Sequence, residues 1–221
     1  MPPSDRPLHL AHPWHGVSAA GSRPGTFHAF IEIVPTDTVK YELDKISGHL
    51  VIDRPQLFSS FCPTLYGFIP QTYCGARVAR RCAQRTALEN IEGDLDPMDI
   101  CVLTEKPVAH GNIFVNARPI GGLRMLDDHQ ADDKIIAVLD RDLSYGALAD
   151  IAECPEGLLE RLRHYFLNYK QAPDNHRRKV HIAEVYDREE ALEVIRLSEL
   201  DYREQIALLD IHHVNLVARE P

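Results

Sequence analysis

Three aspartates lie within six residues of one another in the stretch Glu-Gly-Asp-Leu-Asp-Pro-Met-Asp-Ile, residues 92–100. If this segment is extended, alternate side chains point to the same face, so Asp94 and Asp96 project side by side. Asp99 follows closely, and carboxylates at this spacing repel one another unless a cation lies between them. Mg²⁺ and Mn²⁺ are hard cations that prefer oxygen ligands. The stretch therefore predicts a divalent-cation site.

A short acidic cluster is also typical of a solvated turn, so the rest of the chain must separate the two interpretations. The stretch does not follow the EF-hand pattern, because Met98 stands where the third ligand of that loop belongs. The Asp-x-Asp pair also occurs in nucleotide-sugar transferases and in phosphatases with an aspartyl nucleophile. In those phosphatases the pair directly follows a buried apolar strand, whereas here the mixed segment 88–93 precedes it.

A second acidic group, residues 127–133, stands directly before Lys134 and the apolar run 135–139. Two acidic loops that each adjoin a strand can converge in a curled sheet. Charged side chains also interrupt the first strands expected in the chain, where each one alone would be read as facing solvent. These residues are Glu32, Lys40, Glu42 and Arg54. Because they fall on successive strands, they could instead line one pocket, and both interpretations stay open at this point.

The composition is that of an ordinary soluble globular protein, with 221 residues, 44% hydrophobic and 26% charged. A net charge of −9 argues against a nucleic-acid-binding protein, which normally has a basic surface. We expect no membrane span and no secretion signal, because no apolar run approaches the required length of about 20 residues. The five cysteines form no Cys-x-x-Cys pair and are expected to be free thiols. This usage indicates a cytoplasmic protein.

Residue patterning predicts a single domain, 1–221, in which strands precede most of the helices. We expect strands at 27–34, 39–44, 49–54, 100–104, 112–125 (one or two, bent at Pro119), 135–139 and 179–186. Helices are expected from Pro155 to Lys170 and from Asp187, where Glu190 completes a capping box. Residues 1–25 are expected to form an irregular N-terminal arm that packs through Trp14. Residues 75–90 are expected to form a basic loop or a short exposed helix that faces solvent or another subunit. Residues 187–221 would form the C-terminal helix and tail, for which no structure is assigned from Ile211.

Several segments together resemble the soluble family I inorganic pyrophosphatases. Residues 94–100 are similar to the family signature, which reads Asp-x-Asp-Pro-x-Asp followed by an aliphatic residue. The similarity continues through Lys40-Tyr-Glu-Leu-Asp-Lys-x-Ser-Gly-x-Leu with Asp53-Arg54, Tyr66-Gly-Phe-Ile-Pro, Asp127 with Asp132 and Lys134, and Tyr169-Lys170. It extends from about Phe27 to Tyr186, and five motifs in one order are hard to obtain by chance.

The resemblance implies an α+β, mainly β fold: an OB-like closed five-stranded β-barrel flanked by two or more helices. It implies Mg²⁺-dependent hydrolysis of pyrophosphate to two orthophosphates, with several Mg²⁺ ions in each active site and Mn²⁺ as a possible replacement. Metal ions of this kind lower the pKa of a bound water from about 16 to near neutrality. A homo-oligomer is also implied, typically a hexamer in bacteria and a dimer in eukaryotes.

The resemblance also implies a role for each matching residue. Asp96 would be the general base, and Tyr66 and Lys134 are counted with it as catalytic. The ligands of the first metal ion would be Asp94, Asp99 and Asp132, and Asp99 would also bridge to the second ion. The ions that arrive with substrate would be bound by Asp127, Asp132 and Glu42. The phosphate-binding residues would be Lys40, Arg54, Tyr66, Lys134, Tyr169 and Lys170. Glu32 would support the site from inside the barrel.

The chain departs from the family pattern at two positions near these residues. Cys62 stands where a second Tyr is common, and Leu95 replaces a small or polar residue. Two other functions stay open: a metal-dependent phosphohydrolase acting on nucleoside triphosphates or polyphosphate, and an OB-type module for single-stranded nucleic acid. The chain has no Gly-rich phosphate loop, and its acidic clusters would repel phosphate without metal, so both are less favoured.

Overall fold

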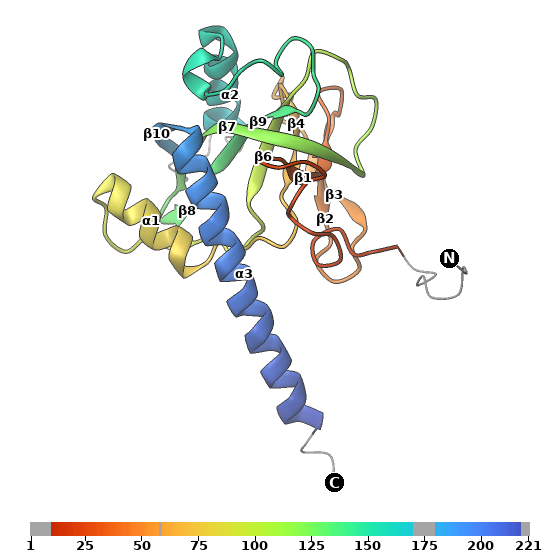
Figure 1. The fold of residues 1–221 in the computed structure, drawn as a ribbon, viewed down its shortest axis with the longest axis vertical. Helices are drawn as coiled ribbons and strands as arrows, with labels where there is room; N and C mark the ends of the chain where they lie inside the picture. The colour runs from red at the N-terminus through yellow and green to blue at the C-terminus, as the bar shows by residue number, and fades with distance from the viewer. Residues whose placement is uncertain (1–9, 58, 170–179, 218–221) are drawn as a thin grey trace.

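The computed structural model describes residues 10–57, 59–169 and 180–217, with side chains in the last helix described as far as Ala207 (Figure 1). The strands are β1 (Phe27–Ile33), β2 (Val39–Leu43), β3 (Leu50–Pro55), β4 (Leu65–Phe68), β5 (Glu92–Gly93), β6 (Asp99–Leu103), β7 (Ile113–Asp127), β8 (Gln130–Ala131), β9 (Lys134–Leu139) and β10 (Val180–Asp187). The helices are α1 (Ala76–Thr86), the 3₁₀ turn η1 (Ile151–Glu153), α2 (Glu156–Asn168) and α3 (Arg188–Val217). Within the described residues, the fold is mainly β with three α-helices, as expected.

Five strands pair in a ring, in the order β1-β4-β6-β9-β7, and β7 also pairs with β1. The long β7 takes part in this ring by changing partner along its length, from β1 to β9 and then to β10. Its register shifts between Pro119 and Gly121, where proline has no N–H to donate to a ladder. A Cβ on Gly121 would lie 2.5 Å from the carbonyl oxygen of Tyr186, so glycine permits the close approach of β10. The predicted bend is therefore present within one continuous strand.

The central strands are buried on both faces, which explains their unbroken apolar runs. Alternate residues of β6 and β9 enter different clusters: Ile100 and Ile135 belong to one, and Cys101 and Ile136 to the other. Helix α2 covers the second cluster with Leu162, Tyr165 and Phe166, which confirms the predicted packing role of its aromatic stripe. All five cysteines are free and buried, as expected for reduced thiols.

Helix α3 begins where the capping-box pattern predicted. The backbone N–H of Glu190 donates to Oδ1 of Asp187 at 2.9 Å, which satisfies an otherwise unpaired amide of the first turn. The helix continues to Val217, well past Ile211, and in Figure 1 its second half runs away from the sheet. Across the described residues, no helix is both long and apolar enough to cross a membrane.

The described part of the N-terminal arm, residues 10–25, is irregular apart from one bridge between Ala20 and Phe27. It packs through Trp14, whose indole N–H donates to the carbonyl oxygen of Thr72 at 2.8 Å. This confirms the predicted anchoring residue of the arm.

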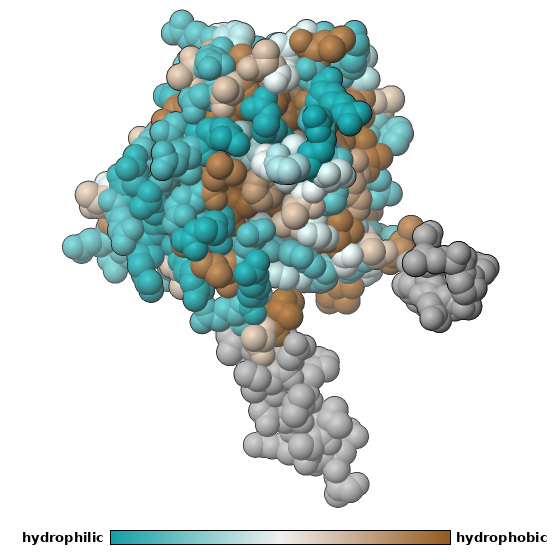
Figure 2. Space-filling model, in the orientation of Figure 1, coloured by the Kyte–Doolittle hydropathy of each residue, from teal (hydrophilic) through white to brown (hydrophobic). Residues whose placement is uncertain are grey.

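The basic segment 75–90 forms a short, partly exposed helix, one of the two forms expected, and its contact with another subunit stays a prediction. This helix is α1, and its arginines at helical spacing pair within the chain: Arg77 with Asp201, Arg81 with Glu190, and Arg85 with Glu184. Figure 2 shows this side of the molecule, over α1, as largely hydrophilic. The sequence identifies the arginines but not their partners, because the paired acids lie about a hundred residues further along the chain.

Candidate active site

Most of the predicted site residues meet in one pocket of about 200 Å³. It is lined by Glu32, Lys40, Glu42, Tyr66, Asp94, Asp96, Asp99, Asp127, Gln130, Asp132, Lys134 and Tyr169. Arg54 is not one of the described lining residues. It lies opposite Lys40 in the β2–β3 hairpin and pairs with Asp53. Lys170 lies outside the described residues.

Sheet pairing brings the two acidic loops together. Strands β6 and β9 are parallel neighbours, which places Asp99 opposite Lys134. Short strands β5 and β8 also pair in parallel, with Gly93 opposite Ala131, so the loop carrying Asp94 is joined to the loop carrying Asp132. The convergence expected from the sequence therefore comes from two backbone ladders.

The backbone between Asp94 and Asp96 is not extended, contrary to expectation. Leu95 has a φ of 66°, in the left-handed region, and the N–H of Asp96 donates to Oδ1 of Asp94 at 3.0 Å. A Cβ on Gly93 would lie 2.0 Å from the carbonyl oxygen of Cys74, so the loop can approach the segment before α1 only with glycine there. A tight turn, rather than strand alternation, directs both aspartates into the pocket.

Lys134 lies at the centre of the acidic groups. Its ammonium pairs with both Asp99 and Asp132, and the hydroxyl of Tyr66 donates to Oδ2 of Asp99 at 2.6 Å. Burial alone lowers the pKa of Lys134, but Asp132 and Asp99 together raise it well above its usual value. Burial and the charge of Asp99 raise the pKa of Tyr66, so its hydroxyl stays protonated and donates. Lys134 is thus a fixed positive charge in the pocket.

Negative charge nevertheless exceeds positive charge in this pocket, where the described lining residues include seven carboxylates and two lysines. Burial, followed by repulsion from Asp132, raises the pKa of Asp94 to about 9. Burial and the charge of Asp99 raise the pKa of Glu32 to about 8. Burial and the neighbouring carboxylates both disfavour the ionised form of these groups, and the two lysines do not offset them. The pocket therefore favours binding of additional cations.

The donor set fits a hard divalent cation, because it consists of carboxylate oxygens. Among the described His, Cys, Asp and Glu side chains, no three are already arranged to hold a metal ion, and the ammonium of Lys134 lies between Asp99 and Asp132. The residues that could hold such an ion are Asp94, Asp99, Asp127, Asp132 and Glu42.

The hairpin β2–β3 forms the other wall of the pocket. Buried Glu32 accepts a hydrogen bond from the backbone N–H of Leu43 at 2.7 Å and so attaches β2 to β1. Nζ of Lys40 lies 3.1 Å from Glu42 and 3.1 Å from Asp53, which holds its charge at the pocket. Glu32 thus lines the pocket from β1, and its supporting role stays a prediction.

The remaining wall comes from α2, where Tyr169 at the C-terminal cap stacks on Tyr165 with ring centroids 5.0 Å apart. Cys62, in the place of the family's second tyrosine, is buried, and burial raises the pKa of its thiol to about 11. It is a neutral packing residue in the second apolar cluster.

Two residues near the site were not singled out from the sequence. Gln130 lines the pocket from β8, but a single amide in a turn suggests no chemistry. Lys45, in the β2–β3 turn, pairs with Asp96 across 51 residues of chain. Its place within the hairpin motif could have indicated it, since that motif ends beside the site.

Comparisons with known proteins agree with this geometry. The family model described as inorganic pyrophosphatase matches residues 29–203. The inorganic pyrophosphatase of Chlamydia trachomatis serovar D is 51% identical over 203 residues, covering 90% of this chain and 97% of the relative. The soluble inorganic pyrophosphatase of Oryza sativa subsp. japonica is 37% identical, covering 85% and 78%.

A solved structure gives the same result. The inorganic pyrophosphatase of Thermus thermophilus superposes with a TM-score of 0.72 at 29% identity, covering 88% of this chain and 99% of that one. The matched region contains both acidic loops, the hairpin and the segment around Tyr66. This chain belongs to the inorganic pyrophosphatase family.

Proposed function

We propose that this chain hydrolyses pyrophosphate to two orthophosphates in the pocket described above, with divalent cations, Mg²⁺ in the first place. The excess of carboxylates in one pocket supports this proposal most directly. Pyrophosphate carries about three to four negative charges, so it would be repelled by this pocket unless cations accompanied it. A site that binds this substrate only together with metal is consistent with the lining residues.

Five carboxylates would hold the cations in the proposed mechanism. Asp94, Asp99 and Asp132 would bind the first, Asp99 would also bridge to the second, and Asp127 and Glu42 would contribute to those that enter with substrate. When bound, such ions neutralise phosphoryl oxygens and make a water acidic enough to supply hydroxide near neutral pH. Lys134 already contacts two of these aspartates, so its positive charge lies beside the carboxylates that would hold the cations.

Asp96 would accept the proton of the attacking water as general base. Its carboxylate is half-exposed at the pocket and contacts Lys45, so it is accessible from solvent. Lys40, Lys134 and Tyr169 would contact phosphoryl oxygens from inside the pocket, and Tyr66 would hold Asp99 in place. Arg54 from the hairpin and Lys170 after α2 are proposed as further phosphate-binding residues.

We further propose that the five-strand ring is the OB-like closed barrel implied by the resemblance. The chain would work in the cytoplasm as a homo-oligomer, a hexamer or a dimer. A mass measurement in solution tests the assembly, and a monomeric mass would contradict it.

Phosphate release from pyrophosphate tests the function. The purified protein is expected to release orthophosphate with Mg²⁺ and to stop when a chelator is in excess; Mn²⁺ should substitute at least partly. ATP and tripolyphosphate serve as competing substrates. No Mg²⁺-dependent release from pyrophosphate, or faster release from ATP, would contradict the proposal.

A further inference from the structure

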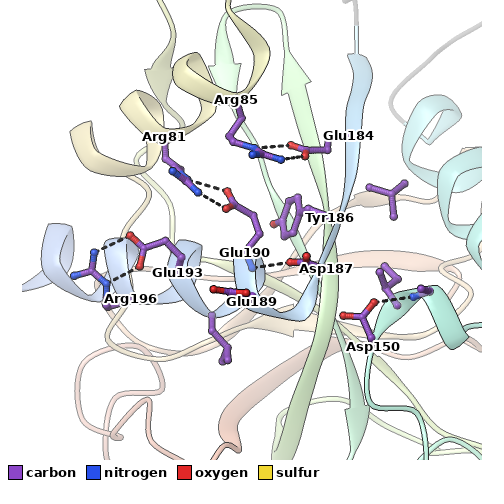
Figure 3. Close-up of a pocket in the computed structure, with 14 residues that line it drawn as sticks. Arg81, Arg85, Asp150, Glu184, Tyr186, Asp187, Glu189, Glu190, Glu193 and Arg196 are labelled. Atoms are coloured by element: carbon purple, nitrogen blue, oxygen red, sulfur yellow. Dashed lines mark hydrogen bonds and ion pairs between the residues drawn. The ribbon is translucent and has the colours of Figure 1, made fainter.

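A second and larger cavity, about 750 Å³, lies between α1, β10, η1 and the start of α3 (Figure 3). We call it the groove. Its charged side chains face one another in pairs: Arg81 with Glu190, Arg85 with Glu184, and Arg196 with Glu193. Carboxylates also cap the first turn of α3, where Asp187 accepts from the N–H of Glu190 and Asp150 from that of Arg188. Each arginine of the groove has a carboxylate partner, and the six described carboxylates that line it outnumber its three arginines, so the groove does not resemble an anion site.

Beneath the groove lies Arg124, a fully buried side chain of β7. Its Nη2 is 2.5 Å from Oε1 of Glu190 and 3.9 Å from Oδ2 of Asp133, and its Nε is 3.5 Å from Glu184. The guanidinium carbon lies 4.9 Å from the ring centroid of Tyr186, whose hydroxyl donates to Asp133 at 3.1 Å. These five residues, Arg124, Asp133, Glu184, Tyr186 and Glu190, form what we call the Arg124 cluster.

The cluster contacts the active-site segment from behind. Asp133 stands between Asp132 and Lys134, which both line the pocket. Neighbouring side chains in extended backbone point to opposite sides, so one three-residue segment faces the pocket on one side and Arg124 on the other. On its far side, Glu190 is held by Arg81 of α1, whose Nε lies 3.0 Å from Oε1. A continuous series of contacts thus joins α1 and α3 to the second acidic loop.

We propose that the Arg124 cluster positions Asp132 and Lys134 for cation and phosphate binding, with Arg124 and Glu190 as positioning residues; this inference rests on the proposed function. Metal ligands must be held to within about 0.5 Å of their productive geometry, which requires support from the residues behind them. Loss of such support typically costs about 10–100-fold in metal affinity. Removing Glu190 would leave the buried Arg124 with weaker partners, and the backbone at Asp133 would shift with it.

Glu190→Gln is the main test variant, with Glu193→Gln as its matched control. Both carboxylates lie near the start of α3 and pair with arginine, but Glu193 pairs with the exposed Arg196 outside the cluster. Cation affinity is measured without turnover by titrating Mn²⁺ alone into the folded full-length chain. The electron paramagnetic resonance signal of free Mn²⁺ reports how much stays unbound. Glu190→Gln is expected to weaken Mn²⁺ binding about tenfold or more, while Glu193→Gln matches the wild type.

Steady-state kinetics give a second readout. Glu190→Gln should raise KM for magnesium pyrophosphate by a larger factor than it lowers kcat, because binding geometry is altered while Asp96 is untouched. A lower melting temperature with unchanged Mn²⁺ affinity and unchanged KM would show that the cluster only stabilises the fold, and would overturn the inference. Wild-type protein that releases no phosphate with Mg²⁺ would instead overturn the proposed function.

A milder pair of variants covers the case in which Glu190→Gln does not fold. Arg81→Gln removes one partner of Glu190 at a half-exposed position, and Arg196→Gln is its control. Arg81→Gln should weaken Mn²⁺ binding in the same direction by a smaller factor. Equal affinity in the two arginine variants would overturn the proposal.

Discussion

The pocket and the groove use the same residue types in opposite ways. In the groove, arginines from α1 and α3 pair with its carboxylates, and the helix start is capped by two more. In the pocket, the described lining residues include seven carboxylates but only two lysines. Burial and repulsion there raise the pKa values of Asp94 and Glu32. The groove is the larger cavity, so size does not distinguish them.

Both cavities are lined by more carboxylates than cationic side chains among the described residues, so the difference lies in what the carboxylates contact. In the groove, five of six pair with arginine or cap α3, which ties the elements together. In the pocket, they crowd around one buried lysine, an arrangement that favours cations.

The largest expected difference between the regions concerns turnover. Asp96→Asn should lower kcat by about 10²–10⁴-fold, because an amide cannot accept the proton of the attacking water. Glu193→Gln, which removes a groove carboxylate, should leave kcat unchanged. Steady-state phosphate release at saturating Mg²⁺ measures both. Near-wild-type kcat in Asp96→Asn would contradict the assigned general base.

The pH dependence of stability should have opposite signs in the two regions. Burial, with Asp99 nearby, raises the pKa of Glu32 from 4.5 to about 8, so the folded chain holds this proton more tightly than the unfolded chain. The free energy of unfolding therefore falls as pH rises from 4.5 through about 8, by about 1.4 kcal/mol for each pH unit. Glu32→Gln removes this loss, so the variant should be more stable than wild type at pH 9 and similar at pH 4.

Urea unfolding in chelator across pH 4–9 measures that difference. In the groove, the hydrogen bond from Arg196 lowers the pKa of Glu193, so its contribution is present above pH 4.5 and is lost in acid. Glu193→Gln should therefore be less stable than wild type at neutral pH, the reverse of Glu32→Gln. The same sign for both variants would contradict the comparison.

Neutralising a pocket carboxylate should stabilise the metal-free protein. Asp94→Asn removes a group whose pKa burial raises to about 9, and we expect a gain of about 1–3 kcal/mol in the free energy of unfolding near pH 8. The same variant should lose most of the increase in melting temperature that Mg²⁺ gives the wild type. Thermal unfolding with and without Mg²⁺ tests both parts, and an unchanged Mg²⁺ effect would remove Asp94 from the ligand set.

The smallest expected effect concerns backbone strain in the pocket loop. Leu95 is exposed and has a φ of 66°, a conformation that costs a non-glycine residue about 1–2 kcal/mol. Leu95→Gly relieves that strain but increases the entropy of the unfolded chain, so a net gain under about 1 kcal/mol is expected. Leu95→Ala keeps the strain and is the control. Equal stability of the two variants would show that Leu95 is not strained.

Local patterns predicted most of the elements. Alternation placed the β2–β3 hairpin, helical spacing placed α2, and the Asp187–Glu190 pair placed the start of α3. The residues of the pocket were also predicted, because their motifs recur in a fixed order and eleven of them line it. The roles of these residues, and the places of Arg54 and Lys170 at the site, stay predictions.

Other features could not be predicted because they depend on partners distant in sequence. Nothing near Arg81 indicates Glu190, and nothing near Arg124 indicates that it is buried between Glu190 and Asp133. The turn at Leu95 was mistaken for an extended segment, since a leucine does not signal a left-handed conformation.

By itself, the sequence determined which residues carry charge, which segments form strands and helices, and which family the motifs resemble, because these depend on neighbours within a few residues. Only the tertiary structure decided which charges are matched. Strand ladders bring Asp94, Asp99 and Asp132 around Lys134, while helix packing supplies the carboxylates of the groove with arginines. Electrostatic energy depends on distance in space, so the same carboxylate types form a proposed cation site in one place and hold the fold together in the other.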